Sequence, residues 1–343
     1  MTALTGRVER RRLLMVSMST FALLNLMAAM SHSFLALAGA RGLLACAAGI
    51  YTPNATALAS ALVPAERRGR AIAIVNGGLT AAIALGVPLG ALVGARFGWR
   101  MTFVGVAVLS AVAVLGLARG LPLGVGATLV SASLGDRVRA VRNPRVARTL
   151  FVTTLWASGG YTVYTYVAPL LHSATTLRGS QIGVALFTWG LAAGLGLFVS
   201  GLATDRFGTG VVSRASLSGL IVALAGLAVV THVVAPATAV VPVLAAMALW
   251  GVCAWAFFPA QQTRFIEIVG IQAAPVALSL NASFMYLGFS IGAALGSFSL
   301  LHVGAGDLGF VGAVCEFVAL MWLLLNQARD GRRHATDIGS ATR

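Results

Sequence analysis

Long apolar runs separated by short polar segments cover almost the whole chain. A helix that crosses a lipid bilayer needs roughly 20 mainly apolar residues, because the hydrocarbon core is about 30 Å thick. Ten runs have about this length: 13–30, 34–62, 71–95, 101–118, 149–171, 182–203, 211–231, 238–262, 277–301 and 308–327. The pattern therefore predicts an all-α polytopic membrane protein with about ten transmembrane helices.

A long polar stretch at 119–148 interrupts this pattern and divides the runs unequally, four before it and six after it. The division predicts a first helix bundle at 1–118, a central loop at 119–148 and a second bundle at 149–327. Residues 328–343 are then a polar tail.

Composition agrees with a membrane protein and the charge distribution gives its orientation. Of the 343 residues, 58% are hydrophobic and 10% are charged, whereas soluble domains carry about 25% charged residues. All 24 basic residues are arginines. If the runs are counted as spans, only Arg96, Arg100 and Arg178 fall on one side, Arg41 lies inside a run, and the others fall on the opposite side. Cytoplasmic loops are enriched in arginine, so we expect a cytoplasmic (inner) membrane protein with both termini in the cytoplasm. This one-sided distribution argues against nucleic acid as the partner of the +15 net charge.

A charged motif lies between the runs 182–203 and 211–231, in the segment Gly201-Leu-Ala-Thr-Asp205-Arg206-Phe-Gly208. Charges between two membrane-length helices are costly unless they are paired. The motif resembles the signature between the second and third helices of each half of a major facilitator superfamily transporter. The resemblance implies that Asp205 and Arg206 form a cytoplasmic gate in a short loop, flanked by the helix-ending glycines Gly201 and Gly208.

Further segments resemble other motifs of this family. They are Arg41 followed by small residues up to Gly49, Pro64 to Ala71, and the ladder Gly86, Pro88, Gly90 and Gly94, which is similar to the fifth-helix motif of antiporters. Glycines spaced by four let two helices approach closely in lipid. The segments Tyr164–Leu171 and Ser279–Ser283 resemble the sugar-efflux and drug–proton antiporter branch, close to arabinose efflux permeases.

The resemblance implies the major facilitator fold, which usually has 12 helices in two halves of six. Four runs before the central loop leave the first half two helices short. Residues 4–12 are similar to the end of a first copy of the signature, with Gly6 in place of its aspartate. Either translation begins further upstream or the shortening is real. The alternative to a transporter is therefore a truncated, non-transporting membrane remnant or a receptor-like scaffold.

Two charged residues inside the runs are candidates for a proton path. A charge at the centre of a membrane helix costs about 2.5–3.5 kcal/mol on insertion scales, so such residues face the bundle interior or water. Arg41 matches an arginine that the family resemblance implicates in proton transfer. Glu316 is the only carboxylate well inside a run.

Aromatic and amide side chains are candidates for a substrate cavity, because the fold places their helices around it. They are Asn54, Asn76, Trp156, Tyr161, Tyr164, Trp250, Trp255, Phe258, Gln261, Gln262, Asn281 and Tyr286. Such a lining suits a largely apolar or amphipathic organic molecule.

The residues give no sign of a metal site, a nucleotide-binding loop or an enzyme. Cys46, Cys253 and Cys315 are scattered over different runs, and clustered Cys/His spacing is absent. We therefore expect a secondary active transporter, a monomer without cofactor, that uses the proton gradient to export a small drug-like or sugar-like molecule by alternating access. An intramembrane enzyme is a weaker hypothesis than a transporter.

Overall fold

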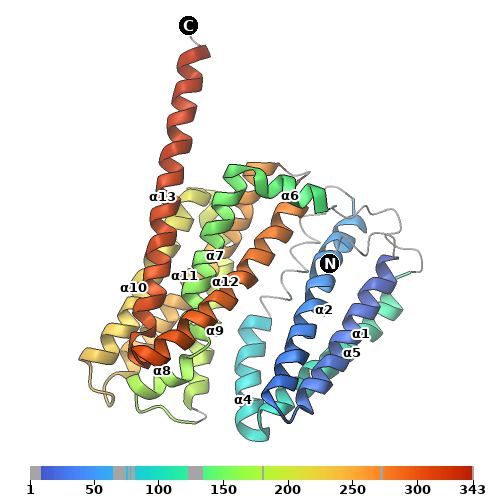
Figure 1. The fold of residues 1–343 in the computed structure, drawn as a ribbon, viewed down its shortest axis with the longest axis vertical. Helices are drawn as coiled ribbons and strands as arrows, with labels where there is room; N and C mark the ends of the chain where they lie inside the picture. The colour runs from blue at the N-terminus through green and yellow to red at the C-terminus, as the bar shows by residue number, and fades with distance from the viewer. Residues whose placement is uncertain are drawn as a thin grey trace. The chain divides into compact units, whose positions relative to one another are not determined.

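A computed structural model describes residues 9–64, 82–122, 134–179, 181–270 and 273–341, together with positions 75 and 78 (Figure 1). All regular secondary structure within these ranges is helical. Contacts divide the chain into two compact units, Met1–Asp136 and Arg137–Arg343. The boundary falls inside helix α6 (Leu134–Arg142) and within the predicted central loop.

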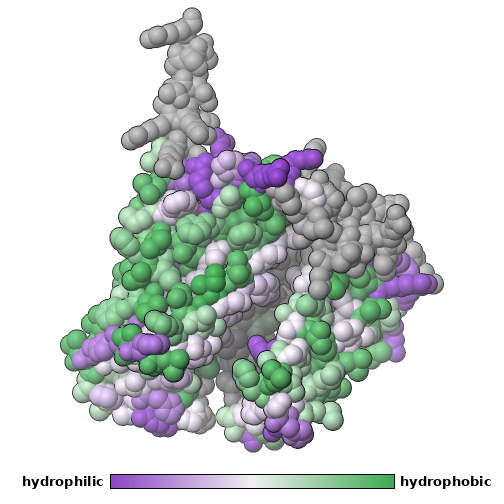
Figure 2. All heavy atoms as spheres, in the orientation of Figure 1, coloured by the Kyte–Doolittle hydropathy of each residue, from purple (hydrophilic) through white to green (hydrophobic). Residues whose placement is uncertain are grey.

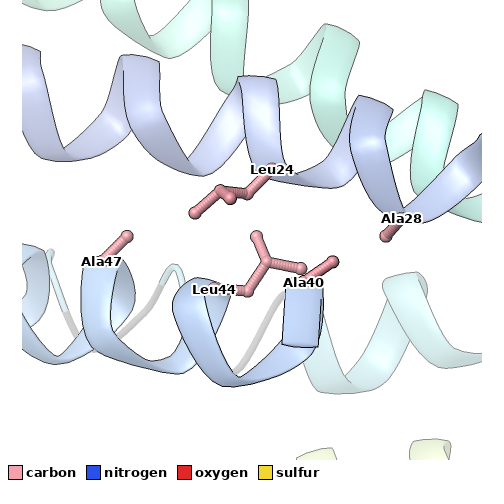
Figure 3. Close-up of a cluster of buried hydrophobic side chains, with 5 residues drawn as sticks. All are labelled: Leu24, Ala28, Ala40, Leu44 and Ala47. Atoms are coloured by element: carbon pink, nitrogen blue, oxygen red, sulfur yellow. The ribbon is translucent and has the colours of Figure 1, made fainter. Parts of the chain in front are cut away.

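Unit 1 contains the long helices α1 (Arg10–Ala29), α2 (Phe34–Ala61) and α5 (Trp99–Gly120). A π-helical turn, η2 (Ala82–Gly86), leads into α4 (Val87–Phe97). α1 lies between α2 and α5 and packs against both. Leucines alternate with alanines in the α1–α2 contact, which is formed by Leu24, Ala28, Ala40, Leu44 and Ala47 (Figure 3). Small residues at such positions bring two helix backbones close together.

Arginines tie the helices of unit 1 at both ends. At one end, Arg11 Nη2 donates a hydrogen bond to the carbonyl oxygen of Ala118 at 2.8 Å. At the other end, Arg100 Nη2 donates to the carbonyl oxygen of Ser31 at 3.0 Å. These bonds satisfy carbonyl groups at or just beyond helix ends, which have no partner within their own helix.

Unit 2 contains seven further helices in the part of the chain that the structure describes: α7 (Pro144–Tyr164), α8 (Val167–Ala174), α9 (Gln181–Phe207), α10 (Thr209–Val233), α11 (Val240–Val269), α12 (Ala274–His302) and α13 (Leu308–Ala341). A short 3₁₀ turn, η3 (Ala305–Asp307), precedes α13. α7 packs against α12 and α13, α11 packs against α9 and α10, and α10 also contacts α13. The helix walls are mainly hydrophobic at the surface, and hydrophilic residues gather at their ends (Figure 2).

The predicted apolar runs correspond to helices wherever the structure describes them. Eight described helices are long and apolar enough to cross a membrane. The run at 71–95 is described over 82–95, where it forms η2 and most of α4. The last run matches the membrane-length span Ala305–Ala328, and α13 continues beyond it as a helix to Ala341, through the predicted tail.

The seventh predicted run, 149–171, is two helices rather than one. α7 ends at Tyr164 and α8 begins at Val167. Pro169 explains the break, because a proline has no N–H to offer the carbonyl group four residues earlier and its ring clashes with that group. The carbonyl group concerned belongs to Thr165.

Three glycines of α12 lie directly on the backbone of α7. A Cβ atom on Gly288 would lie 2.5 Å from the carbonyl oxygen of Thr154, and one on Gly296 would lie 2.6 Å from that of Thr162. Gly292 faces the carbonyl oxygen of Ser158 in the same way. This α7–α12 seam therefore has no room for a side chain at any of its three glycines.

Candidate functional site

An aromatic cluster joins four helices of unit 2. It consists of Tyr161 and Tyr164 on α7, Trp189 on α9, Trp250 on α11 and Phe289 on α12. The rings of Tyr161 and Phe289 stack with centroids 3.6 Å apart. Tyr164 lies 4.9 Å from Trp189, and Trp189 lies 5.6 Å from Trp250. The cluster contains two of the predicted cavity residues with ring hydroxyls, Tyr161 and Tyr164.

The aromatic cluster carries one buried polar atom that its own structure leaves without a partner. Trp189 Nε1 is buried and has no hydrogen-bond partner among the described residues. Side chains that are mostly apolar but keep a few free donors suit an amphipathic organic molecule with acceptor atoms. Trp189 and Phe289 were missed from the sequence, because single aromatic residues in apolar runs give no signal of their own.

The other predicted aromatic residues form a second group. Trp156 lies 5.1 Å from Phe257 and 6.1 Å from Phe258, and Trp255 lies 5.9 Å from Phe258, all between ring centroids. Trp156, Trp255 and Phe258 are each buried. This group packs α7 against α11, and among the described residues no ring contact joins it to the aromatic cluster.

Gln261 and Asn281 belong to a buried polar network. Thr153 Oγ1 donates to Asn281 Oδ1 at 2.7 Å, and Gln261 Nε2 donates to Thr153 Oγ1 at 3.1 Å and to the carbonyl oxygen of Thr149 at 3.0 Å. Gln261 Oε1 and Asn281 Nδ2 have no partner within the described residues. The network thus links α7, α11 and α12 through Thr153, which the sequence analysis did not single out.

Glu316 lies in the middle of the membrane-length span Ala305–Ala328, in the first part of α13, and is fully buried. It faces α7, where a Cβ atom on Gly159 would lie 2.7 Å from Glu316 Oε1. Neither carboxyl oxygen has a hydrogen-bond partner among the residues that the structure describes. A buried carboxyl group without such partners is costly to ionise.

A pair of glycines on α7 separates Glu316 from the aromatic cluster. Gly159 contacts the Glu316 carboxyl group, and a Cβ atom on the adjacent Gly160 would lie 3.7 Å from Trp250 Nε1. Because neither glycine has a side chain, only the α7 backbone stands between the carboxyl group and the indole. The structure thus brings a predicted proton-path residue and the predicted cavity aromatics together.

The gate motif lies in a helix rather than in the predicted loop. Asp205 and Arg206 occupy the last turn of α9, and Gly201 lies inside this helix instead of ending it. Gly208 does end it, with φ of 79°, a conformation that glycine adopts without strain. Both charged side chains are exposed, and the Arg206 guanidinium lies 5.3 Å from the centroid of the Phe207 ring. The predicted pairing of the gate charges stays a prediction.

The candidates of unit 1 are not gathered into one place. Arg41 is exposed on α2. Asn54 is buried and accepts a hydrogen bond from Arg10 Nη1, while its own Nδ2 donates to the carbonyl oxygen of Ile50 at 2.6 Å. Its amide is therefore occupied by unit 1 itself and holds the buried Arg10. Asn76 lies outside the described residues.

The glycine ladder of α4 has open surroundings. Pro88 lies in the first turn of α4, where its missing N–H costs no helix bond. A Cβ atom on Gly86 or Gly90 would meet no atom of the described chain within 4 Å, and one on Gly94 would lie 3.6 Å from Thr102 Cγ2. Among the described residues of unit 1, no helix packs closely against Gly86 or Gly90.

Comparison with known proteins identifies the family of this chain. Residues 1–293 match the Major Facilitator Superfamily. The chain belongs to this family. An uncharacterized MFS-type transporter of Bacillus subtilis (strain 168), YbcL, is 29% identical over 323 residues, which are 94% of this chain and 80% of that protein.

The fold of the family is also found among solved structures. A crystal structure of a mutant of the nucleoside transporter NupG matches with a TM-score of 0.70 at 17% identity, over 94% of this chain and 85% of that one. This likeness confirms the predicted fold class, an all-α polytopic membrane protein with the major facilitator fold. The chain is thus a multi-pass membrane transporter, and its branch within the family stays a prediction.

Proposed function

We propose that this transporter exports a small, largely apolar or amphipathic organic molecule in exchange for protons. The observation that carries the proposal is the position of Glu316, which is separated from the aromatic cluster only by Gly159 and Gly160. Coupled transport needs a site that changes its protonation close to a site that changes its occupancy. Unit 2 offers both, at two consecutive positions of one helix backbone.

The surroundings of Glu316 support a role in proton coupling. Moving a carboxylate into a protein interior costs several kcal/mol unless a partner charge or hydrogen bonds compensate. The described neighbours of Glu316 supply no partner charge, and at most the backbone N–H of Gly160 as a hydrogen-bond donor. We propose that its carboxyl group carries a proton in this arrangement of helices and loses it only when a shift of α13 against α7 admits water. A substrate in the aromatic cluster would influence that shift through the Gly159–Gly160 backbone.

Direction and orientation rest on sequence features. The ladder at Gly86, Pro88, Gly90 and Gly94 resembles an antiporter motif, and the arginine distribution favours a cytoplasmic membrane with both termini inside. We propose that Asp205 and Arg206 act as a cytoplasmic gate, that Arg41 takes part in the proton path, and that the protein works as a monomer without a cofactor. Alternating access would then be a movement of one helix bundle against the other.

An accumulation assay tests this function. In cells that lack their own efflux pumps, a panel of aromatic dyes, amphipathic drugs and sugars would be followed with and without a protonophore. We expect the chain to lower the accumulation of at least one compound, and Glu316→Gln to abolish the part that the protonophore removes. Glu267→Gln is the matched control, because Glu267 is an exposed carboxylate at the end of α11 that bonds to Thr209 Oγ1.

Two results would contradict the proposal in different ways. If the chain inserts in the membrane and alters the accumulation of no compound, export is wrong and the non-transporting alternative gains support. If Glu316→Gln exports with full dependence on the proton gradient, export stands but the coupling residue lies elsewhere.

A further inference from the structure

A small pocket lies at one end of unit 2, where α7 begins and α11 ends. Among its lining residues, α7 contributes Arg148, Thr149 and Val152, α11 contributes Gln261, and α13 contributes Leu323 and Asn326. The free space inside it is about 10 Å³, which is close to what one water molecule needs. The pocket is therefore too small for a transported molecule or a lipid headgroup, and its size matches a single water.

Gln261 lines this pocket and has an unsatisfied acceptor atom. Its Nε2 donates to the carbonyl oxygen of Thr149 at 3.0 Å and to Thr153 Oγ1 at 3.1 Å. Because a carbonyl oxygen can only accept, the amide nitrogen must lie on that side, and Oε1 is the atom that is left over. Gln261 is 1% exposed, and its Oε1 has no hydrogen-bond partner in the described chain. A buried acceptor without a donor is costly.

We infer that one ordered water molecule occupies this pocket and donates a hydrogen bond to Gln261 Oε1. Buried waters typically make about three hydrogen bonds, and the lining offers the other partners. Arg148 uses its Nε and one N–H of Nη1 in bonds within the protein, and a guanidinium has further N–H groups to donate to a water. Thr149 Oγ1 donates its own hydrogen to a carbonyl oxygen of α7 and can accept the second hydrogen of the water.

The water would link two helices that have little contact of their own. α13 packs closely against α7 and α10, and α11 packs against α9 and α10, whereas direct contacts between α11 and α13 are few among the described residues. Arg148 Nη1 donates to Asn326 Oδ1 of α13 at 3.3 Å, so a water between Arg148 and Gln261 connects α11 to α13. Such a bridge can break and re-form as helices shift, because the water moves independently of both side chains. The inference does not depend on the direction or the coupling of transport.

A high-resolution map of the purified chain tests the inference directly. We expect an isolated peak about 2.7–3.2 Å from Gln261 Oε1, with an N–H donor of the lining at a similar distance. An empty pocket, or a side chain of the protein that itself donates to Gln261 Oε1, would overturn the inference. A peak that contacts N–H donors only would also overturn it, because that environment fits a chloride ion instead of a water.

One added methylene group gives a test whose sign differs between a filled and an empty pocket. Val152 is 1% exposed and lines the pocket, so Val152→Ile should extend into the space that the water occupies. If the water is displaced, Gln261 Oε1 loses its donor, and we expect the unfolding temperature in detergent to fall by about 2 °C or more. In an empty pocket the added group would fill a void and raise the unfolding temperature, and the inference would be wrong.

A double variant separates the loss of the water from simple crowding. Gln261→Met removes the acceptor and keeps an unbranched side chain of similar length. In this background Val152→Ile should no longer lower the unfolding temperature, because no acceptor is left without a donor. An equal loss in both backgrounds would show crowding alone and would contradict the inference. If Gln261→Met does not fold, the map of the original chain decides the question.

Discussion

The glycines of α12 and of α4 have the same spacing and different surroundings. In α12, Gly288, Gly292 and Gly296 each rest on a carbonyl oxygen of α7. In α4 and the π-helical turn before it, Gly90 and Gly86 meet no described atom within 4 Å. A spacing of four places glycines on one helix face. Whether another helix packs closely against that face depends on the surface of the neighbouring helix.

The surface of α7 explains why it can pack directly against the glycines of α12. α7 presents Thr154, Ser158 and Thr162, whose hydroxyl groups donate back to carbonyl oxygens one turn earlier, at 3.1, 2.8 and 2.8 Å. Short side chains that bond to their own helix leave its backbone uncovered, so α12 can reach it. A helix in a membrane bundle gains packing in this way without needing apolar side chains at the contact.

The largest expected effect comes from filling the centre of the seam. Gly292→Val would drive a branched side chain into the backbone of Ser158, which cannot move aside as a flexible side chain could. We expect a loss of about 3 kcal/mol or more in the free energy of unfolding, measured by denaturant titration in detergent micelles.

Gly226→Val on α10 is the matched control for the seam variant, because a Cβ atom there meets no described atom within 4 Å. Valine favours helix over glycine slightly, so this variant should keep the free energy of unfolding or raise it a little. Equal losses in both variants would show that the seam is not specially tight.

An intermediate effect is expected from the polar network beside the seam. Thr153→Val removes the hydroxyl group that bonds Asn281 and Gln261 and leaves both amides without that partner. An unsatisfied buried polar group costs about 1–3 kcal/mol, so the same titration should shift by this amount. Thr153→Ser keeps the hydroxyl group and should retain most of the stability. A Thr153→Val protein as stable as the original would show that the Thr153 hydroxyl group contributes little to the attachment of α7 to α12.

The smallest effect on stability is expected in α4. Gly90→Ala adds a methyl group where the described chain leaves space, and alanine favours helix over glycine by about 1 kcal/mol. The free energy of unfolding should stay equal or rise slightly. A loss comparable to that of Gly292→Val would remove the contrast between the two ladders. If stability is kept while export falls, the α4 glycines serve movement instead of folding.

Most of the fold could be predicted from apolar run length, because a bilayer imposes one dominant requirement on every span. Proline effects could not be predicted in the same way. Pro169 accompanies a break between α7 and α8, whereas Pro259 lies inside the continuous helix α11. The charges at Asp205 and Arg206 suggested a loop, but only Gly208 interrupts the helix. Local sequence shows where a helix can end, and tertiary contacts determine whether it does.

The candidate site was predicted less completely. Glu316, Tyr161 and Tyr164 were found because a carboxylate or a hydroxyl group in an apolar run is conspicuous. Asn54 carried the same signal, yet its amide binds Arg10 within unit 1. The partners of a polar side chain come from distant helices, which no pattern along the chain specifies.

The backbone contact at the α7–α12 seam has an evolutionary consequence. Because α12 rests on carbonyl oxygens, which every residue type provides, the identity of Thr154 or Ser158 can drift among small residues without altering the contact. Gly292 has no such freedom, since any other residue adds a Cβ atom. Among relatives that share this seam, we expect the contact residues of α7 to vary in identity and the contact glycines of α12 to stay the same. Correlated substitutions at two contacting positions would therefore not reveal this contact.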